Sequence, residues 1–95
     1  MRTTKREIAW TSAFKRDFKR EKKTDKLLEN ILAPVLSALA NDTSLAPKYR
    51  DHALTGDWLP NRDCHIKPDL ILVYQKPDEE TLLLMRLGSH SELGI

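Results

Sequence analysis

The spacing of apolar residues changes once along this chain, and that change restricts the possible folds more than any other feature. Between residues 12 and 40, apolar side chains recur at helical spacing, so that they line one face of each predicted helix. Between residues 62 and 87 they alternate or run continuously, which is typical of strands in a sheet. A chain that changes from the helical to the extended pattern is expected to form an α+β domain.

These patterns, with the turn residues between them, predict seven elements. They are a strand over residues 3–9, helices over 12–24 and from 24 or 25 to 39, and strands over 54–59, 62–67, 69–75 and 81–87. Pro34 is expected to bend the second helix or interrupt a turn of it. The tail after Gly88 is long enough for one helical turn. The expected order is β-α-α-β-β-β-β, with two N-terminal helices packed on a mainly antiparallel sheet of four to five strands.

Size and cysteine content indicate one small intracellular domain. The 95 residues suit a single domain spanning 1–95. One cysteine cannot form an internal disulfide, which fits a reducing cytosol. The first ten residues are charged and lack the apolar core of a signal peptide, and the apolar runs are too short to span a bilayer. We therefore expect a cytoplasmic protein without a membrane partner.

Charge is distributed unevenly between the two halves of the chain. Residues 1–50 contain twelve Lys or Arg against six Asp or Glu, a balance of +6, whereas residues 51–95 contain four against eight, a balance of −4. A basic half suits a polyanion or an acidic protein as partner. The alternative is that the lysine-rich helix is only a solvated surface.

Alternation along the predicted strand 62–67 separates apolar from polar side chains. Cys64 and Ile66 are expected to face the core, and Asp63, His65 and Lys67 to face the opposite side together. Cys64 is thus more typical of a small buried hydrophobe than of a nucleophile.

Four further polar residues are expected near that face. Asp69 begins the next strand, His52 enters from the preceding loop, and His90 follows the last strand. Arg86 shares the face of His90 if the chain stays extended between them. Histidines act as acid or base near neutral pH, and an arginine holds a phosphate, so this face suits proton transfer on a bound anion.

Other kinds of site find less support in the sequence. Asp63, His65 and Asp69 offer possible metal ligands, but no HExxH or CxxC spacing is present. There is also no glycine-rich phosphate loop and no GxSxG elbow. Trp58 is expected to pack on the sheet rather than to stack on a base.

Three segments of the chain carry a resemblance to a known family. They are "YRDHALTGDW" from Tyr49, "RDCHIKPDLILVY" from Arg62 and "RLGSHSELG" from Arg86. In this order and spacing they resemble the RelE/ParE superfamily of bacterial toxins, and most closely its YafQ-type messenger-RNA endoribonucleases. The resemblance extends over nearly the whole chain.

The resemblance implies a role for individual residues. The implied catalytic set is His52, Asp63, His65, Asp69 and His90. Arg86 matches the phosphate-binding arginine of the superfamily, and Lys67 is expected to assist it. Leu93 stands where the family often has a phenylalanine that stacks on an RNA base. The basic residues expected to bind ribosomal RNA or an acidic antitoxin segment are Lys15, Lys19, Arg20, Lys22 and Lys23.

The implied activity is cleavage of mRNA in the ribosomal decoding site, without metal or cofactor. His90 is the expected acid and His52 or His65 the base, and the products are a 2′,3′-cyclic phosphate or 3′-phosphate and a 5′-hydroxyl. A cognate antitoxin is the expected protein partner, with operator DNA contacted only through it. The alternatives are a binding module of the same fold that acts on a protein target such as gyrase, and a metal-dependent nuclease.

Overall fold

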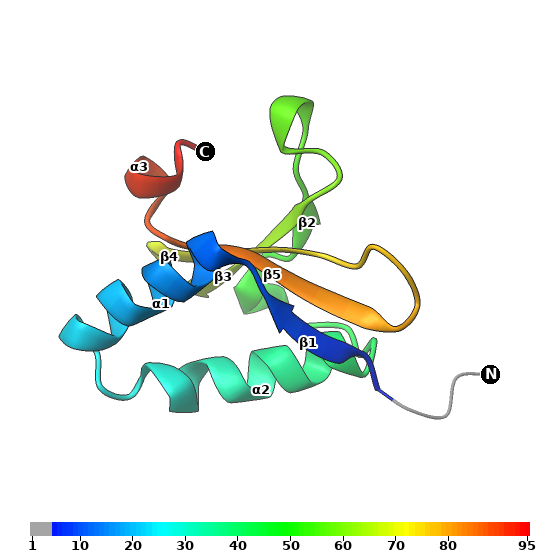
Figure 1. Cartoon of the computed structure of the whole chain (residues 1–95), viewed down its shortest axis with the longest axis horizontal. Helices are drawn as coiled ribbons and strands as arrows, with labels where there is room; N and C mark the ends of the chain where they lie inside the picture. The colour runs from blue at the N-terminus through cyan, green and yellow to red at the C-terminus, as the bar shows by residue number, and fades with distance from the viewer. Residues whose placement is uncertain (1–4) are drawn as a thin grey trace.

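Two helices, α1 (Ser12–Thr24) and α2 (Leu28–Ala40), cover one face of a five-stranded sheet in the computed structural model, which describes residues 5–95. The strands are β1 (Glu7–Trp10), β2 (His52–Ala53), β3 (Arg62–Lys67), β4 (Leu70–Gln75) and β5 (Thr81–Gly88). Two short 3-10 turns, η1 (Pro47–Tyr49) and η2 (Gly56–Trp58), flank β2, and a final helical turn, α3 (His90–Leu93), follows β5. Figure 1 shows α3 and the loop around η2 on the side of the sheet opposite α2.

The strand order is β1-β5-β4-β3-β2. β1 runs parallel to β5, and all other neighbouring pairs are antiparallel. The predicted α+β class, the two N-terminal helices and the mainly antiparallel sheet are therefore confirmed. The helical turn expected after Gly88 is α3. Ser89 and Glu92 form a capping box at its N-terminus.

Two boundaries in the first half differ from the sequence prediction. The first strand begins at Glu7, and the predicted positions 3 and 4 lie outside the described residues. The second helix begins at Leu28 rather than at residue 24 or 25, because Asp25 accepts hydrogen bonds from the backbone N–H groups of Leu27 and Leu28. Pro34 does not interrupt α2, which is continuous from Leu28 to Ala40.

The predicted strand over 54–59 is wrong. The chain forms a strand at His52–Ala53 and then turns at η2, where the N–H of Trp58 donates to Thr55 O at 3.3 Å. Gly56 has φ +62°, a left-handed conformation that ends an extended run and that glycine adopts easily. Apolar residues at 54, 58 and 59 therefore reflect a compact loop rather than a strand.

The sheet separates two apolar clusters of unequal size. The larger lies between the sheet and the two long helices and includes Phe14, Leu28 and Leu72, each with no exposed surface. The smaller lies on the opposite face, where Ile71, Val73 and Leu93 are buried and Trp58 packs against them. The sheet-packing role predicted for Trp58 is confirmed, and the opposite face of the sheet is left only partly covered.

None of the helices within residues 5–95 is long and apolar enough to cross a membrane.

Candidate active site

The register of the sheet aligns three candidate residues and one valine across four strands. His52 pairs with Asp63, Asp63 with Val73, and Val73 with Arg86. Residues that pair directly across neighbouring strands share a face of the sheet. Because Val73 belongs to the smaller apolar cluster, this row lies on the face away from α1 and α2.

A second row brings the remaining histidines to the same place. His65 pairs with Ile71, which pairs with Gly88, and His90 stands two residues beyond Gly88 at the start of α3. The ring centroids are 5.3 Å apart for His65 and His90, and 6.5 Å apart for His52 and His65. The three imidazoles therefore lie side by side, with His52 supplied by β2 rather than by a loop.

His90 is held by a carboxylate and by the helix that it begins. Its Nδ1 lies 2.9 Å from Asp69 Oδ1, and its backbone N–H donates to the same oxygen at 3.3 Å. The side-chain hydrogen bond, supported by the backbone one, lowers the pKa of Asp69. Because Nδ1 is taken by Asp69, Nε2 is the nitrogen left to meet a ligand.

His52 is oriented by the backbone and lies beside a buried acid. Its Nδ1 is 2.7 Å from the carbonyl oxygen of Arg50 and 3.1 Å from Asp63 Oδ1. The carbonyl can only accept, so it selects the tautomer with a proton on Nδ1. Asp63 is 3% exposed, and within the described chain its Oδ1 has no hydrogen-bond partner of good geometry despite that short distance. Burial raises the pKa of Asp63, and the nearby His52, His65 and His90 oppose the rise.

A contact that the sequence did not reveal fixes the segment carrying His52. Tyr74, on the central strand, is 1% exposed, and its hydroxyl donates to Asp51 Oδ1 at 2.5 Å. Arg62 Nε lies 3.4 Å from the same hydroxyl and 3.5 Å from Asp51 Oδ1. Burial, reinforced by the Asp51 carboxylate, raises the pKa of Tyr74. Only the assembled sheet places position 51 beside position 74.

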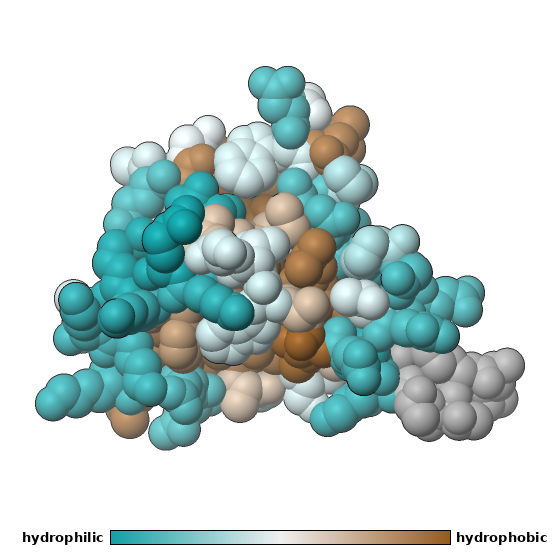
Figure 2. All heavy atoms as spheres, viewed as in Figure 1, coloured by the Kyte–Doolittle hydropathy of each residue, from teal (hydrophilic) through white to brown (hydrophobic). Residues whose placement is uncertain are grey.

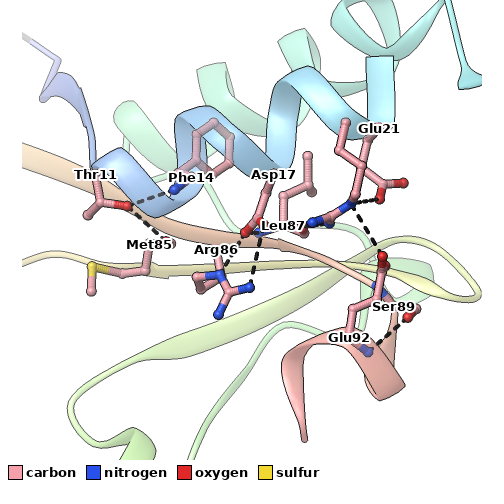
Figure 3. Close-up of polar contacts among 10 residues, drawn as sticks. Thr11, Phe14, Asp17, Glu21, Met85, Arg86, Leu87, Ser89 and Glu92 are labelled. Atoms are coloured by element: carbon pink, nitrogen blue, oxygen red, sulfur yellow. Dashed lines mark hydrogen bonds and ion pairs between the residues drawn. The ribbon is translucent and has the colours of Figure 1, made fainter. Parts of the chain in front are cut away.

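Asp17 on α1 reaches the edge of β5 and binds Arg86 there (Figure 3). Its Oδ2 accepts from Arg86 Nε at 2.7 Å and from the backbone N–H of Leu87 at 2.9 Å. Burial alone would raise the pKa of Asp17, but the hydrogen bonds from Arg86 and Leu87 outweigh it and lower the pKa. Arg86 thus shares the face of Asp63, while its guanidinium is drawn toward α1.

Arg20 connects the same part of α1 to α3, and is therefore not a free surface cation. Its guanidinium donates to Asp17 Oδ1 at 3.0 Å and to Leu87 O at 2.8 Å. Its Nε also lies 3.3 Å from Glu92 Oε2, in the capping box of α3. The RNA-binding role predicted for Arg20 competes with these contacts, which position the helix that begins at His90.

Two other predicted binding residues do not join the histidines. The ladder is irregular between His65 and Lys67, and Lys67 pairs with Leu70 of the larger cluster, so its side chain leaves the predicted face and contacts Asp25. This bulge corrects the expectation that Lys67 follows His65. Leu93 is 5% exposed and packs against Ile71 and Val73, so it anchors α3 and does not offer its side chain to a base.

Exposed cations remain on α1. Lys15, Lys19 and Lys23 are exposed and make no ion pair within residues 5–95, whereas Lys22 pairs with Glu29. Figure 2 shows hydrophilic side chains gathered over α1.

Within the described residues, neither Cys64 nor a cluster of metal ligands forms a second candidate site. Cys64 has no exposed surface, and burial raises the pKa of its thiol to about 12, which opposes nucleophilic use at neutral pH. In the part of the chain that the structure describes, no three His, Cys, Asp or Glu side chains are grouped so as to hold a metal ion.

Comparison with known proteins gives one consistent family. A family model described as bacterial toxin of type II toxin-antitoxin system, YafQ, matches residues 6–94. The mRNA interferase toxin YafQ of Escherichia coli BL21-DE3 is 36% identical over 89 residues, which covers 94% of this chain and 96% of that protein. The putative toxin YafQ of Haemophilus influenzae is 40% identical over 63 residues, and there the match spans 63% of this chain and only 62% of that protein.

Solved structures show the same fold. A metal-bound toxin from Helicobacter pylori superposes with a TM-score of 0.83 at 48% identity, covering 90% of this chain and 96% of that one. The toxin chain of the E. coli DinJ–YafQ complex superposes with a TM-score of 0.81 at 35% identity, covering 93% and 97%.

Proposed function

Because this chain belongs to the YafQ family of bacterial toxins of type II toxin–antitoxin systems, we propose that it is a ribosome-dependent mRNA endoribonuclease that inhibits translation. The E. coli relatives are named mRNA interferase toxins, which supports the reaction class. The observation that carries the proposal is the convergence of three imidazoles on the partly covered face of the sheet, with neighbouring centroids 5.3 and 6.5 Å apart.

The proposed reaction is RNA transesterification and requires no metal. A base takes the proton of a ribose 2′-hydroxyl, and the oxygen attacks the adjacent phosphorus. The bond from phosphorus to the 5′-oxygen breaks, and an acid protonates that oxygen. The products are a 2′,3′-cyclic phosphate, which water can open to a 3′-phosphate, and a 5′-hydroxyl. DNA lacks the 2′-hydroxyl and is expected to be inert.

We assign the acid to His90 and the base to His52 or His65. Asp69 orients His90 through Nδ1, and the Arg50 carbonyl orients His52, so each ring presents Nε2 to the substrate. Asp63 adds negative charge beneath the rings. Arg86 is one-third exposed, and its Nη1 makes no hydrogen bond within residues 5–95, so this edge of the guanidinium is available to a phosphate oxygen.

The partners of this chain follow from the same proposal. The E. coli relative was crystallised with the antitoxin DinJ, and we propose a cognate antitoxin here, with operator DNA contacted only through it. Lys15, Lys19 and Lys23 are the exposed cations proposed to meet ribosomal RNA in the cytoplasm. The whole chain 1–95 is proposed to act as one domain.

Primer extension on a message during induced expression, with end-group analysis of the fragments, tests this function. Wild-type protein is expected to give new 5′-hydroxyl ends inside coding sequence, and His52→Ala, His65→Ala and His90→Ala are each expected to slow cleavage. The imidazole mechanism is wrong if all three variants cut like the wild type.

A metal-dependent nuclease is the rival that one observation favours, since relatives from H. pylori have been crystallised as metal-bound and copper-bound toxins. Cleavage is expected to survive EDTA in reactions whose ribosomes are shown by sedimentation to remain intact. Loss of cleavage on intact ribosomes, restored by added metal, would favour the rival.

A further inference from the structure

Beside the histidines, on the helix side of β3, lies a groove that we name the η1 groove. Ile31 and Pro34 of α2, Tyr49 and Arg50 at η1, and His65 and Ile66 of β3 line it, and its volume is about 580 Å³. We propose that the η1 groove binds one nucleotide of single-stranded RNA next to the scissile phosphate. This inference rests on the proposed function and adds to it a binding site for the substrate.

The lining of the η1 groove combines an aromatic ring, an apolar floor and cations. Tyr49 is partly buried against the large cluster, and Lys48 Nζ lies 5.2 Å from the centroid of its ring. Grooves that hold single-stranded nucleic acid combine stacking surfaces for bases with cations for the backbone. The volume lies within the range of pockets that enclose small ligands, roughly 300–1,000 Å³.

The charges of the η1 groove favour an anion. Lys48 and Arg50 both line it, and neither makes an ion pair with a carboxylate within residues 5–95. The third cation in the lining, Lys67, is already paired with Asp25, and none of the lining residues is acidic. An anion placed between Lys48 and Arg50 would therefore meet two cations that no carboxylate neutralises within residues 5–95.

The backbone at Arg50 ties the groove to the histidine cluster. Arg50 has φ +48°, an uncommon conformation for a residue with a side chain. In this conformation its carbonyl meets His52 Nδ1 while its side chain lines the groove. His65 belongs both to the groove and to the row of imidazoles. An RNA strand whose scissile phosphate lies at the imidazoles would thus place an adjacent nucleotide in the η1 groove.

An NMR titration with a 2′-O-methylated RNA tetranucleotide tests the proposal, because the methyl groups prevent cleavage. Amide signals of Ile31, Ile66 and residues 48–50 are expected to shift. The double variant Lys48→Gln/Arg50→Asn, in which asparagine tolerates the positive φ, is expected to weaken binding about tenfold, as the loss of a charged hydrogen bond predicts. The control Lys5→Gln also removes one exposed cation but lies outside the groove, just before β1 at the other edge of the sheet, and is expected to bind like the wild type.

Three results would overturn the η1 groove as an RNA site: no shifts, shifts confined to α1, or equal displacement of the RNA by a short polyglutamate peptide. Message cleavage on ribosomes is measured separately with the wild type. Binding in the groove without cleavage would refute the proposed function and leave the site in place. Cleavage without shifts in the groove would refute the site and leave the function in place.

Discussion

The two ends of the histidine row are held in different ways. At one end, His90 begins a short helix whose capping box is joined through Arg20 to Asp17 on α1, and Asp69 holds its ring. At the other end, His52 lies on a strand of two residues and is oriented by one backbone carbonyl. The His90 end therefore depends on charged contacts between elements far apart in the chain, and the His52 end on a neighbouring carbonyl and on one hydrogen bond from a buried tyrosine, Tyr74.

This difference predicts different sensitivities. Arg20 is 41% exposed and Glu92 is 42% exposed, so salt screens the ion pair that joins α1 to α3, and such exposed ion pairs contribute little singly. The segment carrying His52 is instead anchored by a hydrogen bond that the hydroxyl of buried Tyr74 donates to Asp51. A position held by a network of exposed charges is easier to loosen without unfolding the core than one attached to a central strand.

The largest effect on the cleavage rate is expected when His90 is replaced. His90→Ala removes the proposed acid and is expected to lower the single-turnover cleavage rate on programmed ribosomes by roughly 10²–10⁴-fold. Ser91→Ala, the neighbouring exposed position on α3, serves as the control and is expected to cut normally. Equal rates for the two variants would remove His90 from the mechanism.

The second prediction distinguishes Arg20, which positions α3, from Lys19, which is proposed to bind ribosomal RNA. Arg20→Ala is expected to slow cleavage about tenfold even at saturating toxin, because it removes the guanidinium that joins Glu92 of α3 to Asp17 and to Leu87 O. Lys19→Ala is expected to weaken ribosome binding while the saturated rate stays unchanged.

Amide hydrogen exchange of α3 distinguishes a positioning role for Arg20 from general destabilisation. Exchange is expected to accelerate in α3 but not in β4 of Arg20→Ala. Unchanged exchange in α3 together with a lower affinity for ribosomes would show that Arg20 is an RNA-binding residue after all.

A smaller effect is expected at Asp63, where substitution is expected to stabilise the fold rather than to impair the protein. Its folded-state pKa is raised, so the folded state binds the proton more tightly than the unfolded state, and wild-type stability falls as pH rises from about 4 through the folded pKa. His52, His65 and His90 face the carboxyl favourably and Asp51 unfavourably. The Asp63→Asn variant has no carboxyl at this position and does not lose stability in this way as pH rises. It is expected to be about 1 kcal/mol more stable than the wild type at pH 8 and equally stable near pH 3.

Urea unfolding of wild type and Asp63→Asn at pH 3 and pH 8 measures this effect. Asp69→Asn is the matched control, because it removes the acid at the other end of the row, whose pKa is lowered rather than raised. A variant at 63 that is less stable than the wild type at pH 8 would show that the buried carboxylate stabilises the fold.

The smallest effect is expected at the anchor of the His52 segment. Tyr74→Phe removes the hydroxyl that donates to Asp51, and water can replace it because Asp51 is partly exposed. A loss of about 0.5 kcal/mol in unfolding free energy is expected. Exchange should accelerate at residues 51–53 but not in α3, and faster exchange in both would show that the two ends are coupled.

Much of the fold was predictable because apolar periodicity is a local property. Spacing indicated α1, α2 and the three long strands, and it placed Cys64 and Ile66 in the core. It failed at residues 54–59, where Gly56 turns the chain, and at Lys67, where a bulge reverses the expected direction of one side chain. A bulge depends on which residues pair across strands, and a single strand's own sequence does not specify that.

The sequence by itself determined the α+β pattern, the basic first half of the chain and the presence of three histidines in the second half. Only the tertiary structure decided how they are used. It brought the imidazoles of positions 52, 65 and 90 together through the register of four strands, and it committed Arg20 and Arg86 to Asp17. The reason is physical: hydrogen bonds and ion pairs join groups that are close in space, and chain folding sets that closeness over separations of up to 75 residues here.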